Sequence, residues 1–410
     1  MMTRKGMTRR ELITGAAGAA AAASVSGLAG CFPNVGGQWP DAGPDVAGGG
    51  SACGCPPRDG GGRSSAGDGN AKSGPVAGSA KVVTIQRDDS LDANLKPQSE
   101  VVQSMVDSLL FNLSGGADNP WSVLLPDADR CTRIGLKVNC LAPRTPTSPV
   151  LVHAIVHSLK EKGGFCPSNI IIWERYLTEM LDSNKNNIYA EALGLGARAV
   201  GTNEAPSPDG VAPAIRGTGP GYGEPLDGFE GKDPGVAPRI SKVLADLTDV
   251  TINVPVLKAH PECGFTVALK GCYGMFDCPQ NYHHPYLQDA MPKLYAIPEI
   301  NKSVRLTIMD ALRASVTANN ASPPDRSPAR ISASLDPLAL DCYALDLANQ
   351  LRTKPPRGAP LPPLRTDRLV WMENAHKLGI GARSYRLVTP GADGEDTVDG
   401  GLADAESQSG

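Results

Sequence analysis

The sequence lacks any excess of positive charge. Over 410 residues, 39 Lys and Arg are outnumbered by 43 Asp and Glu, which gives a net charge of −4 at pH 7. The first 30 residues alone carry +3, so the rest of the chain carries −7. Nucleic-acid binding depends on clustered Lys and Arg that neutralise phosphates. We therefore expect no nucleic-acid partner.

The sequence also lacks the standard spacings of protein metal sites. Its 10 cysteines include no four-cysteine run of the iron–sulfur type, which argues against such a cluster. His153 and His157 are four residues apart on an expected helix and could hold a metal between them. No glutamate follows His153 in the manner of a zinc protease, so we interpret both as surface or half-buried histidines.

Residues 1–30 combine a charged start, an alanine-rich apolar run and a small-residue ending, which are the parts of an export signal. Arg9 and Arg10 mark the twin-arginine version, whose partner is the export machinery of that pathway. The ending Leu28-Ala29-Gly30-Cys31 resembles a lipobox, which implies cleavage before Cys31 and a lipid on its sulfur. We expect an extracytoplasmic lipoprotein, held on a membrane in the periplasm or at the cell surface without a transmembrane helix. A buried alanine-rich helix is the alternative.

Residues 31–80 contain no Leu, Ile, Met or Tyr, but they contain 14 glycines and 6 prolines. Such a stretch cannot bury enough apolar area to offset its ordering entropy. We expect a flexible Gly/Pro-rich tether. Cys53 and Cys55 lie within it, and we expect an exposed pair in an oxidising compartment rather than a metal clip, because two cysteines alone make a poor site.

From residue 81 to residue 390, segments of strand and helix periodicity alternate. Strands are expected over residues 133–141, 169–173, 250–256, 304–309, 331–334 and 385–388. Helices are expected over residues 99–113, 148–160, 239–247, 264–275, 285–294, 336–352 and 366–378. This alternation predicts a single globular α/β domain with a mostly parallel sheet flanked by helices. The Gly/Pro-rich residues 201–238 are a candidate lid, and residues 391–410 are expected to be an acidic disordered tail.

The richest chemistry follows the strand that ends near residue 256. Lys258 and His260 emerge there, and Thr266 and Lys270 would share one face of the next helix. Ammonium groups, a hydroxyl and a helix N-terminus suit a carboxylate or phosphate, with His260 as acid or base near neutral pH. A solvated lysine face is the alternative.

Other strands end in polar residues. Lys137 and Asn139 share one face of the strand over 133–141, and Glu174 directly follows the apolar strand over 169–173. His283 and His284 are adjacent in a loop and would point apart. A divalent metal is possible if one of them joined His260, Asp310 or Glu174. Cys272 and Cys278 are six residues apart across an expected turn and could form a disulfide.

Seven ordered segments resemble one family over about residues 134–343. They are IGLKVNCL, NIIIWER, INVPVLKAH, GFTVALKGCYG, YHHPYL, LTIMDALR and SLDPLALDCYAL. They resemble the domain-of-unknown-function 362 family, whose members are α/β proteins with no agreed reaction. The resemblance implies motif roles for Lys137, Asn139, Lys258, His260, Thr266, Lys270, Asp310, Asp336 and Asp341. Gly271 stands where the family usually has an asparagine.

The first hypothesis is a lipid-anchored enzyme of unassigned reaction that acts on an anionic small molecule. Its candidate catalytic residues are His260, Lys270 and Asp310. Its candidate ligand-binding residues are Lys137, Asn139, Glu174, Lys258, Thr266, Asp336 and Asp341. The second hypothesis is a non-catalytic binding or scaffold lipoprotein, and the third is redox chemistry by Cys272 and Cys278.

Overall fold

The computed structural model describes Cys53, Cys55 and residues 80–141, 144–205, 215–216, 219–317, 322–355, 359–391 and 394–401. The expected export signal with Arg9 and Arg10, the expected lipidation site Cys31 and most of the expected tether lie outside these residues. No helix in the described ranges is long and apolar enough to cross a membrane.

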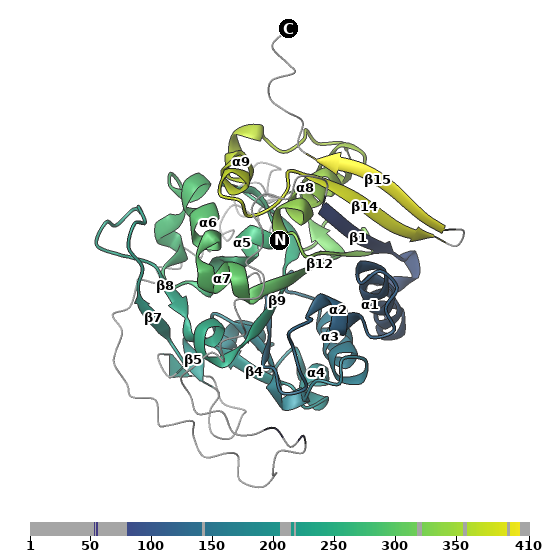
Figure 1. The fold of residues 1–410 in the computed structure, drawn as a ribbon. Helices are drawn as coiled ribbons and strands as arrows, with labels where there is room; N and C mark the ends of the chain where they lie inside the picture. Colours follow the sequence, from purple (N-terminus) through teal and green to yellow (C-terminus); the bar gives the residue numbers. More distant parts are fainter. Residues whose placement is uncertain are drawn as a thin grey trace, which may run out of the picture. The chain divides into compact units, whose positions relative to one another are not determined.

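The described chain alternates strands and helices, as its periodicity predicts (Figure 1). The main sheet comprises β1 Ala80–Gln86, β2 Ile134–Val138, β3 Ile170–Glu174, β4 Arg198–Gly201, β9 Val250–Val254, β10 Val256–His260, β11 Gly264–Thr266, β12 Val304–Ser315, β13 Arg330–Ser334, β14 Ser384–Gly391 and β15 Gly394–Gly401. The helices are α1 Ser99–Leu113, α2 Pro120–Leu124, α3 Pro149–Glu161, α4 Ala190–Gly194, α5 Ala268–Gly271, α6 Leu287–Ala296, α7 Pro298–Ser303, α8 Pro337–Thr353 and α9 Val370–Lys377.

The sheet is mixed but mostly parallel, in the order β15-β14-β1-β13-β12-β9-β2-β3-β4. The run from β12 to β4 is parallel throughout. At the other end, β13 lies antiparallel to both β12 and β1, and β15 lies antiparallel to β14. β10 and β11 form a hairpin beside β12, off the main path. The predicted single α/β domain is therefore confirmed.

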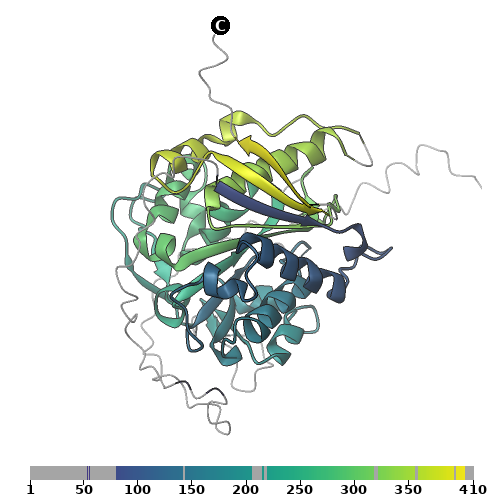
Figure 2. The ribbon, with the colours of Figure 1, turned by 45° about the vertical axis from the view of Figure 1, so that its right-hand side comes forward.

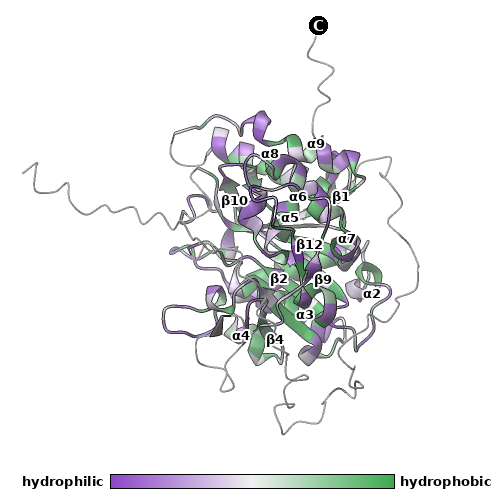
Figure 3. Ribbon diagram, turned by 90° about the vertical axis from the view of Figure 1, so that its left-hand side faces the viewer, coloured by the Kyte–Doolittle hydropathy of each residue, from purple (hydrophilic) through white to green (hydrophobic). Residues whose placement is uncertain are grey.

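Helices cover both faces of the sheet (Figure 2). Alternate residues of β2 and β3, such as Ile134, Leu136 and Ile172, pack with α1 to α4 in one core. The opposite face packs against α5 to α9 and includes Trp173 and Met309. Because both faces are covered, β2 and β3 are apolar over most of their length, and Figure 3 shows the hydrophobic colour, green, around β2 and β9.

Three segments differ from their expected structure. Residues 239–247 form strand β8 Arg239–Ser241 and a π-helix, Val243–Leu247, instead of one α-helix. Residues 264–275 form strand β11, the short helix α5 and a 3₁₀ turn, Cys272–Met275. The expected disordered tail contributes β15, which pairs with β14 along its whole length. In each case tertiary pairing overrides local propensity.

The Gly/Pro-rich segment 201–238 is only partly described. It contributes two small antiparallel pairs, β5 Glu204–Ala205 with β6 Ile215–Arg216, and β7 Tyr222–Pro225 with β8. Its role as a lid stays a prediction.

Cys53 and Cys55 are not a free exposed pair. Cys53 is bonded to Cys166 with a Cα–Cα distance of 5.8 Å, and Cys55 is bonded to Cys131 at 5.6 Å. Cys131 precedes β2 and Cys166 precedes β3, so both bonds lie at the amino edge of the parallel strands. The pairing is long-range, and sequence spacing could not reveal it.

Candidate functional site

The candidate site forms where two neighbouring strands diverge. β2 pairs with β9 as far as Val138 and Val254. After Pro255 the chain continues as β10, which pairs with β12 and β11 and not with β2. Open α/β sheets place ligand sites at such points on the carboxyl edge. A cavity of about 110 Å³ lies here. Cavities of about 150 Å³ hold benzene, so this one suits a ligand of a few non-hydrogen atoms.

The cavity brings together eight of the residues singled out from the sequence. They are Lys137, Asn139, Glu174, Lys258, His260, Thr266, Lys270 and His283. The remaining lining residues are Leu141, Arg175, Glu179, Gly271, Tyr273, Gly274, Pro279 and Gln280. The strand-end argument therefore located the cavity, although the expected helix carrying both Thr266 and Lys270 does not exist. Thr266 lies on β11, directly opposite Lys258 on β10.

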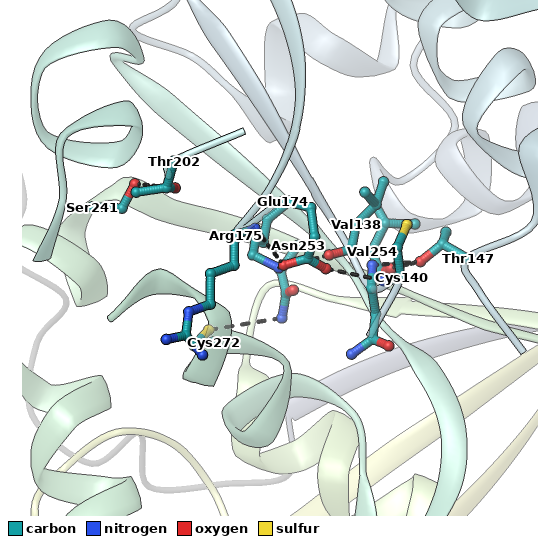
Figure 4. Close-up of polar contacts among 12 residues, drawn as sticks. Val138, Cys140, Thr147, Glu174, Arg175, Thr202, Ser241, Asn253, Val254 and Cys272 are labelled. Atoms are coloured by element: carbon teal, nitrogen blue, oxygen red, sulfur yellow. Dashed lines mark hydrogen bonds and ion pairs between the residues drawn. The ribbon is translucent and has the colours of Figure 1, made fainter. Parts of the chain in front are cut away.

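A buried ion pair lines the cavity. Lys137 Nζ lies 2.7 Å from Glu174 Oε1, and both side chains are almost fully buried. The other carboxylate oxygen, Oε2, accepts the Cys140 N–H at 3.0 Å (Figure 4). A Cβ at Gly274 would lie 2.9 Å from both Lys137 Nζ and Glu174 Oε1. Only glycine lets the turn after α5 approach this pair so closely.

Lys258 is a fixed cation. Its Nζ donates to Asn139 Oδ1 at 2.6 Å and to the Thr145 carbonyl at 3.1 Å, and its side chain is buried. Burial lowers the pKa of Lys258 to about 8. No carboxylate of the described residues pairs with it, so its charge is available to an anionic ligand.

Lys270 has different surroundings. Its Nζ lies 3.3 Å from His283 Nε2 and 3.7 Å from the centre of the Tyr273 ring. Burial lowers the pKa of Lys270 to about 8. Asp341 accepts the N–H groups of Ala268 and Leu269 and thereby fixes the first turn of α5, which carries this lysine.

His260 and His283 are stacked, with ring centres 5.7 Å apart. The Glu262 N–H donates to His260 Nδ1 at 3.2 Å, so the ring proton of a neutral His260 resides on Nε2. Burial, with Lys270 and His283 as further causes, lowers the pKa of His260 to about 2. His260 is therefore neutral at pH 7, and the expected acid/base group near neutral pH is instead a hydrogen-bonding imidazole.

We expect the stability of the wild type, relative to His260→Asn, to fall as the pH is lowered below 6.5. The unfolded chain takes up a proton at this residue near its ordinary pKa of about 6.5, whereas the folded chain does not. The wild type should lose about 1.4 kcal/mol per pH unit relative to the variant. Urea unfolding of both proteins between pH 7.5 and pH 4.5 measures this. Parallel pH profiles would contradict the buried neutral imidazole.

Arg175 and Glu179 line the cavity but were not predicted as site residues. Arg175 is buried, and its Nε has no hydrogen-bond partner among the described residues. Burial, followed by the nearby charge of Glu174, raises the pKa of Glu179 well above its ordinary value. Glu179 can therefore carry a proton near neutral pH. Arg175 could have been predicted as a site residue from its position directly after a buried strand, whereas nothing in the sequence marks Glu179.

Three predicted aspartates stabilise the backbone around the cavity rather than line it. Asp310 lies inside β12 and accepts the Ser148 N–H at 2.7 Å, and burial raises its pKa to about 6. Asp336 caps α8 by accepting the Ala339 N–H. Asp341 caps α5, and burial raises its pKa to about 7. The structure thus gives Asp310 no direct catalytic position, because its oxygens are turned to backbone N–H groups.

The structure does not support the expected metal site. His284 does not line the cavity, and His283 is held by Pro279 and Lys270. Among the described residues, no group of three or more His, Cys, Asp or Glu side chains could hold a metal ion.

The predicted Cys272–Cys278 disulfide is wrong, because Cys272 is a free buried thiol.

The fold and the cavity define an α/β protein with a small cationic site at the carboxyl edge of its parallel strands. The model of the family described as Domain of unknown function (DUF362) matches residues 134–346, just over half of the chain. The chain belongs to this family. The match spans both strands that diverge at the cavity. Among curated proteins, none matches the chain.

Proposed function

We propose that this protein is an enzyme acting on a small anion, of the size of a short carboxylate or a phosphate. The observation that carries the proposal is the charge of the cavity. Lys258, Lys270 and Arg175 line it, and within the described residues none of them has a carboxylate partner. Glu174 and Glu179 lie in the same cavity but form no ion pair with these three cations. Buried cations without an ion-pair partner are costly, and an anionic ligand would pair with them.

The proposal predicts that Lys258→Met weakens anion binding by about 10- to 100-fold, because a hydrogen bond between charged groups contributes about 1.5 to 3 kcal/mol. Thermal-shift titration of the full chain with phosphate, oxalate and pyruvate measures the dissociation constants. Lys293→Ala, which removes an exposed lysine of α6, is the matched control and should bind as the wild type does. Equal affinity of wild type and Lys258→Met, or no stabilisation of the wild type by any anion, would refute the anion site.

We also propose that the protein works outside the cytoplasm, as a lipoprotein exported by the twin-arginine pathway. The paired Arg9 and Arg10 and the lipobox-like ending at Cys31 motivate this. The bonds Cys53–Cys166 and Cys55–Cys131 support it, because disulfides persist in oxidising compartments. Fractionation of the native host tests it: Cys31→Ser should release the protein from the membrane fraction, and Arg9→Lys/Arg10→Lys should retain it in the cytoplasm.

A non-catalytic binding protein is the second candidate. It is favoured by the two stacked imidazoles, since both are neutral and their Nδ1 atoms are engaged by backbone groups. To distinguish the candidates, an anion that binds the protein is incubated with it, and mass spectrometry follows the mass of that anion over time. Chemical conversion of the anion indicates an enzyme, and unchanged exchange indicates a binding protein.

A further inference from the structure

The three lysines of the cavity differ in what their amino groups contact. Lys137 is paired with Glu174, and Lys258 donates to two oxygen atoms. Lys270 Nζ instead contacts an imidazole nitrogen and the face of an aromatic ring. In the described part of the chain no oxygen acceptor holds the protons of Lys270. Burial lowers the pKa of Lys258 and of Lys270 to about 8 alike, but only the amino group of Lys270 is not held by oxygen acceptors, so it can turn its lone pair toward a ligand.

A proton acceptor lies beside this amino group. His283 Nδ1 lies 2.8 Å from the Pro279 carbonyl oxygen, which can only accept, so this nitrogen carries the ring proton. Nε2 of the same ring then has a free lone pair and lies 3.3 Å from Lys270 Nζ. Burial lowers the pKa of His283 to about 4, so the ring stays neutral, and Nε2 can relay a proton from the amine to a ligand without retaining it.

The cavity also gives a ligand access to the amine. Lys270 is only partly buried, and the adjoining Gly271 and Gly274 place no side chain in the cavity. At neutral pH, a lysine with its pKa lowered to about 8 has roughly 200 times more free amine than an exposed lysine. Lys258 and Arg175 line the same small cavity and can bind a carboxylate next to the reacting group.

We propose that Lys270 is a nucleophile that forms a Schiff base with the carbonyl group of a small 2-oxo acid, whose carboxylate binds Lys258 and Arg175. The inference rests on the proposed function and names its substrate class. A 2-oxo acid fits because its adjacent carboxylate and carbonyl make a short ligand, in keeping with the cavity volume of about 110 Å³.

The step balances without a further reactant. Nζ of Lys270 bonds to the carbonyl carbon, and one amine proton passes through His283 Nε2 to the carbonyl oxygen. The resulting hydroxyl takes a second proton from the protonated carboxyl of Glu179 and leaves as water, while the C=N bond of the iminium forms. The two lysines at the ends of the ligand therefore have different roles: Lys258 positions the carboxylate and Lys270 reacts.

The test is reductive trapping. The full chain is incubated with pyruvate or glyoxylate and sodium cyanoborohydride, followed by intact-mass measurement and peptide mapping. We expect one adduct per chain on Lys270, no adduct in Lys270→Arg, and an unchanged adduct in the surface control Lys293→Ala. Lys270→Arg keeps the positive charge, and its melting temperature shows whether the fold is retained.

An adduct on Lys258, an adduct spread over exposed lysines such as Lys293, or no adduct with either acid overturns the assignment. Thermal shift in the same samples separates this failure from that of the proposed function. If pyruvate stabilises the protein but is not trapped, the anion site stands and the Schiff base does not. If no anion stabilises the protein, both fail.

Discussion

Replacing Lys137 by methionine is expected to lower the free energy of unfolding by about 3 to 5 kcal/mol. Lys137 Nζ is the partner of Glu174 at 2.7 Å, and both side chains are almost fully buried. Without the lysine, the carboxylate keeps the N–H groups of Cys140 and Arg175 but loses its counter-charge. A buried charge that loses its partner costs far more than the pair contributes. Urea unfolding monitored by circular dichroism measures the loss.

A double-mutant cycle isolates the pair. Lys137→Met combined with Glu174→Gln should be clearly less destabilised than the two single variants together, because no unpaired charge remains. Lys160→Met is the control, since Lys160 and Glu161 form an exposed pair at 3.0 Å. That variant should change stability by less than about 1 kcal/mol. If Lys137→Met were as mild as this control, the buried charge of Glu174 would not depend on Lys137.

Removing either long-range disulfide is expected to cost about 2 to 4 kcal/mol. Cys53 and Cys166 are 113 residues apart in the sequence, and Cys55 and Cys131 are 76 apart. Bonds that close long loops restrict the unfolded chain strongly, which is one account of their effect. Urea unfolding of Cys53→Ser/Cys166→Ser in buffer without reductant measures the first bond, and Cys55→Ser/Cys131→Ser measures the second.

The matched control for the first bond is the single variant Cys53→Ser. It breaks the same bond as the double variant and should be destabilised to a similar extent. Both bonds lie at the amino edge of β2 and β3, so anion binding at the carboxyl edge should not change. Peptide mapping under non-reducing conditions checks the pairing itself. A direct Cys53–Cys55 bond would overturn it.

Lys137 and Lys258 show why part of the site could be predicted from the sequence. Each lies in or directly after an apolar strand, and parallel strands bring their carboxyl ends to one edge. Polar residues at the carboxyl ends of neighbouring parallel strands therefore lie close to one another. Glu174 was found by the same reasoning, and it proved to be the partner of Lys137.

Asp310 and Asp341 show the limit of that reasoning. Both lie close to the cavity in the fold, and both are motif positions of the family. Their oxygens nevertheless accept backbone N–H groups of Ser148, Ala268 and Leu269. Whether a carboxylate faces a ligand or a helix end depends on the path of another chain segment, which local sequence does not encode. Glu179 was missed for the same reason.

The sequence by itself determined the fold class, because hydrophobic periodicity and turn residues are local properties that fix the alternation of strands and helices. It also determined that lysines gather at strand ends. Only the tertiary structure decided the order of the strands, the divergence of β10 from β2 and the bonding partners of Cys53 and Cys55. It also distinguished the three lysines by their contacts: Lys137 forms an ion pair with Glu174, Lys258 donates to oxygen atoms, and Lys270 contacts only His283 and an aromatic ring. These differences arise from contacts between residues far apart in the chain, whose energies exist only once the strands have paired.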